Sequence, residues 1–311
     1  MSAEAKTSPS IKHMEVRRYP FVVPGEAGEG LEALEAKSFV LRKVDYHPSG
    51  SIVLDIELDE EGNEAEKYEN KLDEQGRIVE HLHYMSGELS ERITIKYNEA
   101  GKITEEARHY EEGDPSLTIY VYDAQNRLLE KRIESSPGEV EHCDRYTYHA
   151  EGKENVETHE EFGYDMAPIR VIRHVYEIKD GEPVLAETHS ENKETGKKYR
   201  TVHHDARTHE DNVSAVVYDS DERVAEVLRE FYDEHGRQTR VTQKTRTPAS
   251  DPVFEYEYDE RGNVILQRQL IGGKPWAEVK RRYNEHNLQA WQATDHSNIG
   301  YFTDVFSYEL Y

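Results

Sequence analysis

The stretch YVYDAQNRLLE at residues 120–130 returns almost unchanged as EYEYDERGNVI at residues 255–265. In both, a tyrosine is followed by Asp, two variable positions, and then Asn or Gly. Asp hydrogen-bonds the backbone two residues on, while Gly or Asn accepts the left-handed conformation that a tight turn requires. The phrase therefore predicts a hairpin turn that the chain uses more than once.

An aromatic anchor precedes this turn at intervals of 25 to 28 residues along the chain. A regular period of this length is the signature of a repeat architecture. The structural repeat anchors are Tyr46, Tyr97, Tyr122, Tyr148, Tyr176, Tyr232, Tyr258, Tyr283 and Tyr308, with Leu72 and His204 in the two other anchor positions. Midway between anchors lie clusters of Gly, Pro, Asn, Asp and Ser, which end strands. Each unit is therefore predicted to be strand, turn, strand, turn.

Ten such units predict an all-β fold, a long antiparallel meander of about twenty strands built from β-hairpin repeats. Open twisted sheets rarely exceed about ten strands without curling, so we expect a curled or spiral sheet, with a free edge strand at Phe302–Leu310. An unpaired edge strand can pair with another chain, so we also expect edge pairing with a partner or a homo-oligomer. Residues 1–43 are expected to be a leader, partly disordered or packed on the array, and residues 44–311 the repeat array.

Alternation within the strands predicts which side is buried. Phe254, Tyr256 and Tyr258 fall on one face, while Glu255 and Glu257 fall on the other. Because successive side chains of a strand point to opposite faces, we expect one aromatic, buried face and one charged face in water.

The charge of the sequence excludes some classes of binding partner. The 64 acidic and 39 basic residues give a net charge of -25, which repels phosphate backbones and anionic membranes. We therefore expect no nucleic acid partner, and a protein partner with a basic surface is the natural complement. The sequence shows neither a secretory signal nor an apolar stretch long enough to span a membrane. Cytoplasmic residence is the default expectation, with signal-independent export as the alternative.

The segments DRYTYHAEGK (144–153), EFYDEHGRQ (230–238) and FEYEYDERGNV (254–264) resemble the YD repeat, also called the Rhs repeat. The resemblance covers roughly residues 44–311. It implies a β-hairpin array that wraps into a hollow shell or spiral, as used in bacterial toxin delivery and in large cell-surface proteins. Toxins of that family continue into a cleavage motif and a toxic domain, whereas DPSL at 114 and DPVF at 251 fall in mid-unit turns here. The resemblance therefore implies the array alone, without the toxin and core-cleavage region.

Candidate chemistry is sparse. His203, His204, Asp205 and His209 form the densest group of metal-ligating residue types, but His204 replaces an anchor and Asp205 is the turn Asp. His81 and His83 share one face of a strand, which the register predicts to be in solvent. We therefore predict no metal and no cofactor.

Nucleophilic chemistry is no better supported, because His142, Cys143 and Asp144 are neighbours along a strand and so point to alternating faces. The prediction is that the chain is not an enzyme.

Trp276 and Tyr164 lie in predicted mid-unit loops, where the repeat requires no large aromatic side chain. They are the predicted contact residues. The leading hypothesis is a non-catalytic scaffold that binds or encloses another polypeptide, as an accessory of a bacterial toxin or secretion system. The alternative is a surface module that binds glycans through exposed aromatic residues.

Overall fold

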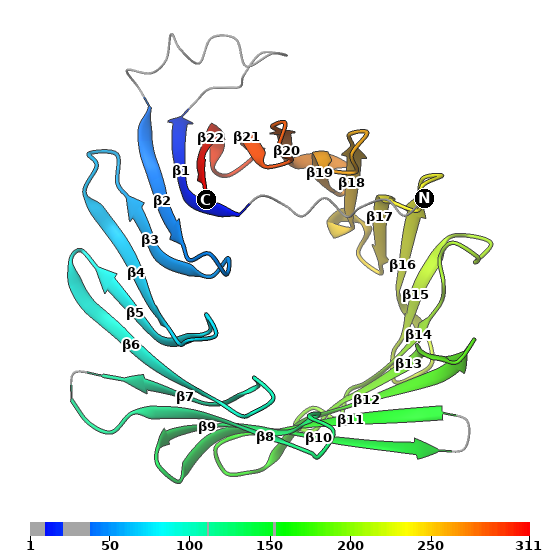
Figure 1. Ribbon diagram of the computed structural model, residues 1–311. Coiled ribbons are helices and arrows are strands. Elements are labelled where there is room, and N and C mark those ends of the chain that lie inside the picture. Colours follow the sequence, from blue (N-terminus) through cyan, green and yellow to red (C-terminus); the bar gives the residue numbers. More distant parts are fainter. Residues whose placement is uncertain (1–9, 21–37, 111, 152–153) are drawn as a thin grey trace. The chain divides into compact units, whose positions relative to one another are not determined.

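The computed structural model describes residues 10–20, 38–110, 112–151 and 154–311. Within these ranges the strands form one 22-stranded sheet, so the prediction of an all-β fold is confirmed (Figure 1). The elements are β1 (Ile11–Pro20), β2 (Phe39–Tyr46), β3 (Ile52–Leu58), β4 (Glu64–Leu72), β5 (Ile78–Met85), β6 (Glu88–Tyr97), β7 (Ile103–His109), β8 (Ser116–Tyr122), β9 (Leu128–Ser136), β10 (Glu139–Glu151), β11 (Glu154–Phe162), β12 (Pro168–Lys179), β13 (Glu182–Asn192), β14 (Lys198–His203), β15 (Val213–Tyr218), β16 (Val224–Tyr232), β17 (Gln238–Thr245), the short 3-10 helix η2 (Pro248–Ser250), β18 (Pro252–Tyr258), β19 (Val264–Ile271), β20 (Lys274–Tyr283), β21 (Gln289–His296) and β22 (Gly300–Leu310).

The repeated phrase forms the hairpin turn that it predicts. Between β4 and β5, the Asp73 amide donates to the Arg77 carbonyl at 2.9 Å and the Gly76 amide donates to the Asp73 carbonyl at 3.0 Å. The Asp73 carboxylate accepts the amides of Gln75 and Arg77, both at 2.9 Å, and Gly76 takes a φ of 77°. The same arrangement recurs at Asp123, Asp233 and Asp259.

All nine tyrosine anchors lie in even-numbered strands. They are Tyr46 in β2, Tyr97 in β6, Tyr122 in β8, Tyr148 in β10, Tyr176 in β12, Tyr232 in β16, Tyr258 in β18, Tyr283 in β20 and Tyr308 in β22. Four anchors donate their hydroxyl to the first residue of the preceding strand: Tyr122 to Ile103, Tyr148 to Leu128, Tyr283 to Val264 and Tyr308 to Gln289. These hydroxyls satisfy backbone carbonyls next to the turns, which is a structural use of the anchor.

The chain divides into two compact units. Unit 1 comprises Met1–Thr94, Glu255–Leu270 and Lys274–Tyr311, and unit 2 comprises Ile95–Phe254 with Ile271–Gly273. In unit 2, each strand from β7 to β17 pairs antiparallel with the next one along the chain. This is the predicted meander.

The ends of the meander, which belong to unit 1, do not match the prediction. Strand β1 pairs antiparallel with β22 on one side and with β2 on the other, and Figure 1 shows it between these two strands. The sheet is therefore closed through β1, and the expected open, curled or spiral sheet is wrong. The expected free edge at Phe302–Leu310 is also wrong, because β22 has a partner on both sides.

Specific side-chain contacts hold β1 in place. Arg18 donates from Nε and Nη2 to the two carboxylate oxygens of Asp304, both at 2.8 Å, and its guanidinium lies 4.0 Å from the centroid of the Phe302 ring. On the other side, His13 Nδ1 lies 2.6 Å from Asp45 Oδ1. Part of the segment expected to be a leader thus supplies β1, and β2 begins before residue 44. Residues 21–37 lie outside the described residues.

The two faces of the sheet in unit 2 differ from the predicted pattern. Cross-strand partners point to the same face, so Tyr148, Glu157 and Tyr176 share what we call the tyrosine face. The residues Cys143, Val156 and Val175, which are only 1%, 2% and 6% exposed, lie on the opposite face. The expectation that the aromatic face alone is buried is therefore wrong.

The physical reason is the composition of the opposite face. Arg132 is the cross-strand partner of Cys143, and long arginine side chains bury their aliphatic stems on small apolar neighbours while the charged group stays in water. A strand that reads as charged therefore still covers apolar atoms. The sheet has small buried clusters on a single layer rather than one thick core.

Candidate functional site

Carboxylates on the tyrosine face of unit 2 contact aromatic and imidazole groups. The contacts are Tyr120 hydroxyl to Glu106 (2.7 Å), His159 to Asp144 (2.7 Å) and Tyr232 hydroxyl to Glu230. Burial and the hydrogen bond to Glu106 raise the pKa of Tyr120, so its hydroxyl stays protonated. A neutral donor does not cancel the charge of the carboxylate that accepts from it.

Two carboxylates on the opposite face, those of Glu130 and Glu134, contact arginines instead. Arg132 donates to Glu130 at 2.8 Å and to Glu134 at 2.7 Å, and Arg145 donates to Glu130 at 3.2 Å. The backbone amide of Gly138, and after it Arg132, holds the pKa of Glu134 below its ordinary value. Against the opposing effect of burial, Arg132 and Arg145 hold the pKa of Glu130 below its ordinary value. The carboxylates of Glu130 and Glu134 are therefore compensated by arginines within the sheet.

The excess of negative charge is clearest across β10, β11 and β12. In the described part of these strands, the tyrosine face carries Asp144, Glu157 and Glu161, and its one Lys or Arg side chain is Arg170, which pairs with Glu161 at 3.1 Å. An uncompensated carboxylate that stays in water attracts cations. This part of the tyrosine face is the best-defined candidate binding surface.

A hollow of about 460 Å³ lies on these strands, and we call it the Tyr148–Tyr176 hollow. Its walls include Arg127, Tyr148, Asn155, Glu157, Tyr176 and Pro183. Glu157 is the direct cross-strand partner of Tyr148, and Asn155 is that of Tyr176. Two repeat anchors from alternate strands thus flank a carboxylate and an amide on the strand between them.

The hollow combines neutral aromatic rings with charged groups. Burial, with Glu157 second, raises the pKa of both Tyr148 and Tyr176, so both rings are neutral at physiological pH. The guanidinium of Arg127 lies 4.5 Å from the centroid of the Tyr148 ring and is tied to Asp123 at 2.7 Å. The hollow therefore offers aromatic faces, an amide and a carboxylate.

A second hollow of about 650 Å³ is lined by His203, His204 and Asp205 of the histidine-rich segment, though not by His209. His203 Nε2 lies 3.1 Å from Thr188 Oγ1, the rings of His204 and His209 are 4.8 Å apart, and Asp205 accepts from Arg207 at 3.0 Å. Burial lowers the pKa of His203 and His204. Within the described residues, no group of three or more His, Cys, Asp or Glu side chains is placed to hold a metal ion.

The pair His81 and His83 does not lie in solvent as predicted. His83 stacks on Tyr68 with ring centroids 4.3 Å apart, and His81 Nδ1 lies 2.7 Å from Asn70 Oδ1. Burial lowers the pKa of His81. The register places both imidazoles beside Tyr68 and Asn70 of β4, which the alternation of this polar strand did not reveal.

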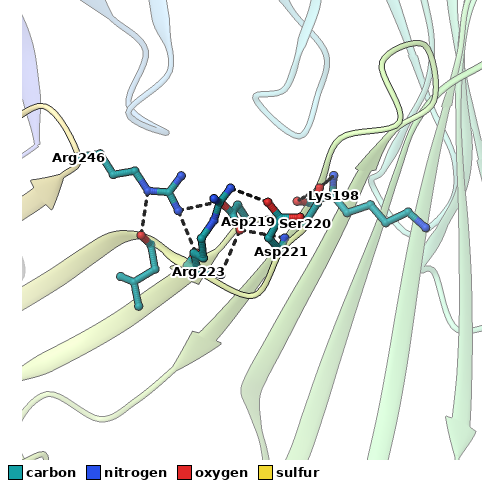
Figure 2. Close-up of polar contacts among 7 residues, drawn as sticks. Lys198, Asp219, Ser220, Asp221, Arg223 and Arg246 are labelled. Atoms are coloured by element: carbon teal, nitrogen blue, oxygen red, sulfur yellow. Dashed lines mark hydrogen bonds and ion pairs between the residues drawn. The ribbon is translucent and has the colours of Figure 1, made fainter.

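A third hollow, of about 460 Å³, lies on the opposite face beside the turn at residues 219–223. Figure 2 shows that this turn is held by the Arg246 side chain and by the backbone of Lys198. Arg246 donates to Asp219 at 2.7 Å and to the Val224 carbonyl at 3.0 Å, and Ser220 Oγ accepts the Lys198 amide at 3.1 Å.

The Asp219 contacts have a clear electrostatic consequence. Arg246 above all holds the pKa of Asp219 well below its ordinary value. The polar groups of this network are used in fixing a turn, so we assign it a structural role.

The two predicted contact residues, Tyr164 and Trp276, are not among the residues that line the Tyr148–Tyr176 hollow. Tyr164 is 79% exposed and sits in the turn between β11 and β12. Trp276 lies within β20 rather than in a loop, and its ring meets His296 edge-on at 5.7 Å. Tyr164 belongs to unit 2 and Trp276 to unit 1.

The sequence singled out the anchors Tyr148 and Tyr176 but missed Asn155 and Glu157. Both lie in ENVETHEEF, where polar residues occupy both faces of the strand, so alternation gives no sign of which ones face the tyrosines. The register of β11 between β10 and β12 was the missing information.

Comparison with known proteins gives distant likenesses. A family model described only as "Uncharacterised protein" matches residues 88–169. No curated protein matches the chain.

Among solved structures, TcdB2-TccC3-Cdc42 shares 13% identity with a TM-score of 0.41, over 89% of this chain and 16% of that one. A porin-like protein from Bacteroides uniformis shares 10% identity with a TM-score of 0.30, over 97% of this chain and 98% of that one. The chain thus spans less than a fifth of the TcdB2-TccC3 chain that it matches. Such distant likenesses carry no function over to this chain.

A search for membrane-spanning helices found none in the described residues.

Proposed function

We propose that this chain is a non-catalytic repeat scaffold that binds another polypeptide on its tyrosine face, and that the polypeptide presents basic side chains. The observation that carries the proposal is the difference between the two faces of unit 2. On the tyrosine face, carboxylates such as Glu106 and Asp144 contact a tyrosine hydroxyl and an imidazole. On the opposite face, Glu130 and Glu134 contact arginines.

The charge of the whole sequence supports the same partner. A net charge of -25 steers basic proteins toward the chain and repels acidic ones. Aromatic side chains such as Tyr148 and Tyr176 add contact area at little conformational cost, because a tyrosine has only two side-chain torsions. In keeping with the resemblance of its repeats, the scaffold would serve as an accessory of a bacterial toxin or secretion system.

Affinity capture with the intact chain tests the proposal. Capture from the native host is run at about 0.1 M and about 1 M salt, where the Debye length is about 10 Å and about 3 Å. We expect a basic polypeptide that is retained at low salt and largely lost at high salt, with chemical cross-links that map to β10–β12. Cross-links confined to other strands, or retention that does not depend on salt, would contradict the proposal.

A second candidate function is glycan binding. Paired aromatic rings beside an amide and a carboxylate, as at Tyr148, Tyr176, Asn155 and Glu157, also suit a sugar that stacks on one face and hydrogen-bonds at its edge. A glycan array separates the two. Sugar binding that persists at about 1 M salt would favour the glycan, because stacking and neutral hydrogen bonds are screened little by salt.

A further inference from the structure

We propose that the Tyr148–Tyr176 hollow is the seat for a single arginine or lysine side chain of the bound polypeptide, held against the ring of Tyr176 with Glu157 as its counter-ion. This inference deepens the proposed function and rests on it. It assigns a specific position and a ligand chemistry to what is otherwise a diffuse acidic surface.

The first argument is the position of Glu157. Its strand partners are Tyr148 on β10 and His174 on β12. No lysine or arginine of the described residues pairs with its carboxylate, whereas its neighbour on this face, Glu161, is paired with Arg170 at 3.1 Å. A half-buried carboxylate without a basic partner gains from any cation that replaces the water around it.

The second argument is the ring of Tyr176. The chain places its own cations over other tyrosines of unit 2. Arg127 lies 4.5 Å from the centroid of Tyr148, which lines the same hollow, and Arg200 lies 4.6 Å from that of Tyr218. In the part of the chain that the structure describes, no cation lies over Tyr176. A guanidinium or ammonium over a tyrosine ring is attracted by the negative face of the ring, so Tyr176 offers a partner the chain itself does not supply.

The third argument is the shape and polarity of the hollow. About 460 Å³ accommodates an extended basic side chain, and the apolar walls given by Tyr148, Tyr176 and Pro183 suit its methylene stem. Asn155, the cross-strand partner of Tyr176, supplies an amide oxygen that accepts a hydrogen bond. The methylene stem, the positive charge and the N–H donors of an arginine or lysine side chain would each meet a complementary group in the hollow.

The test uses the full chain and three Gly/Ser peptides that carry arginine, lysine or norleucine at every third position. Binding is measured by fluorescence anisotropy for the wild type, Glu157→Gln and the matched control Glu160→Gln. Glu160 is three residues along β11 and faces the opposite way, as the partner of Val171, so both variants lose one charge.

We expect Glu157→Gln to weaken the arginine and lysine peptides roughly fivefold or more, the scale of a partly desolvated cation–aromatic and charge contact. Glu160→Gln is expected to stay within about twofold of the wild type, because a surface charge outside the site is screened. The norleucine peptide is expected not to bind.

Two further variants test the contribution of the Tyr176 ring to binding. Tyr176→Leu is expected to weaken the basic peptides, while Tyr176→Phe, which keeps the ring, is expected to bind nearly as the wild type does. Thermal melts check that each variant is folded. If Tyr176→Leu does not fold, the comparison of Glu157→Gln with Glu160→Gln still decides the matter.

The outcomes separate this inference from the function on which it rests. Equal weakening by Glu157→Gln and Glu160→Gln would show a diffuse charge effect and overturn the seat while the scaffold proposal stands. Equal binding of the norleucine peptide would overturn it as well. Capture of no basic polypeptide at any salt concentration would remove the proposed function itself.

Discussion

At the scale of single residues, the backbone conformation is specified mainly in the turns. Glycine or asparagine holds the left-handed position in most of the repeated turns, but Met166 takes it between β11 and β12 with a φ of 56°. A residue with a Cβ in this conformation costs roughly 1 kcal/mol. This turn is therefore locally strained compared with the turn at Gly236, where φ is 75°.

Relief of that strain gives a first prediction. Met166→Gly is expected to raise the free energy of unfolding by about 0.5–1 kcal/mol, because removal of the left-handed penalty, roughly 1–2 kcal/mol, outweighs the greater unfolded-chain entropy of glycine, roughly 0.5–1 kcal/mol. Urea unfolding measures the change. The reciprocal Gly236→Met is expected to lower stability by a similar amount, since a Cβ at Gly236 meets open space and only backbone strain changes. No loss in Gly236→Met would refute the strain argument.

The turn aspartates give a prediction for pH. Amide hydrogen bonds and Arg237 hold the pKa of Asp233 below its ordinary value, while the unfolded chain has a pKa of about 3.9. The carboxylate therefore contributes stability above about pH 4, and this is lost as the pH falls through the folded pKa. Asp233→Asn keeps the turn acceptor but cannot titrate. Its stability, followed by urea unfolding between about pH 6 and about pH 3, should fall less steeply than that of the wild type.

At the scale of elements, the anchor hydroxyls connect each hairpin to the strand before it. The Tyr122 hydroxyl donates to the Ile103 carbonyl at 2.8 Å, and burial raises the pKa of Tyr122, so the donor stays protonated. Tyr122→Phe leaves that carbonyl without this partner and is expected to cost about 1 kcal/mol. The matched control is Tyr164→Phe in an exposed turn, which is expected to change stability by less than about 0.5 kcal/mol. Equal melting temperatures of the two variants would argue against the anchor bond.

At the scale of elements, prediction from the sequence was most successful for the hairpin turns. The phrase around Asp73 and Asp123 specified the turns, since Asx hydrogen bonds and a left-handed fourth position are local properties. The hollow was not predictable to the same extent. Tyr148 and Tyr176 were visible as anchors, but the placing of Glu157 between them depends on the register of three strands, which a polar strand with no apolar alternation leaves unspecified.

At the scale of the whole molecule, closure was the feature that local sequence could not show. Residues 11–20 carry neither the anchor nor the turn phrase of the repeats. Their pairing with β22 joins segments nearly 300 residues apart, such as Arg18 with Asp304. Pairing of this kind satisfies the backbone groups of two strands that would otherwise be edges. The period of a repeat predicts which strands pair within the array, but it does not predict which strand pairs with the first or the last one.

Disruption of β1 should therefore open the sheet and cause molecules to associate with one another. Val16 is 4% exposed and pairs with Arg42 of β2 and Phe306 of β22. Val16→Pro removes the backbone amide and introduces a ring into a strand that is paired on both sides, a position where proline is rarely tolerated because it cannot donate to the ladder. We expect β2 and β22 to present unpaired edges, and sedimentation to show larger species whose fraction grows with protein concentration. Val16→Thr keeps the amide and the branched side chain, so it is expected to sediment as the wild type does. If Val16→Pro also sediments as the wild type at every concentration, then β1 is not what keeps these two edges from pairing with other molecules.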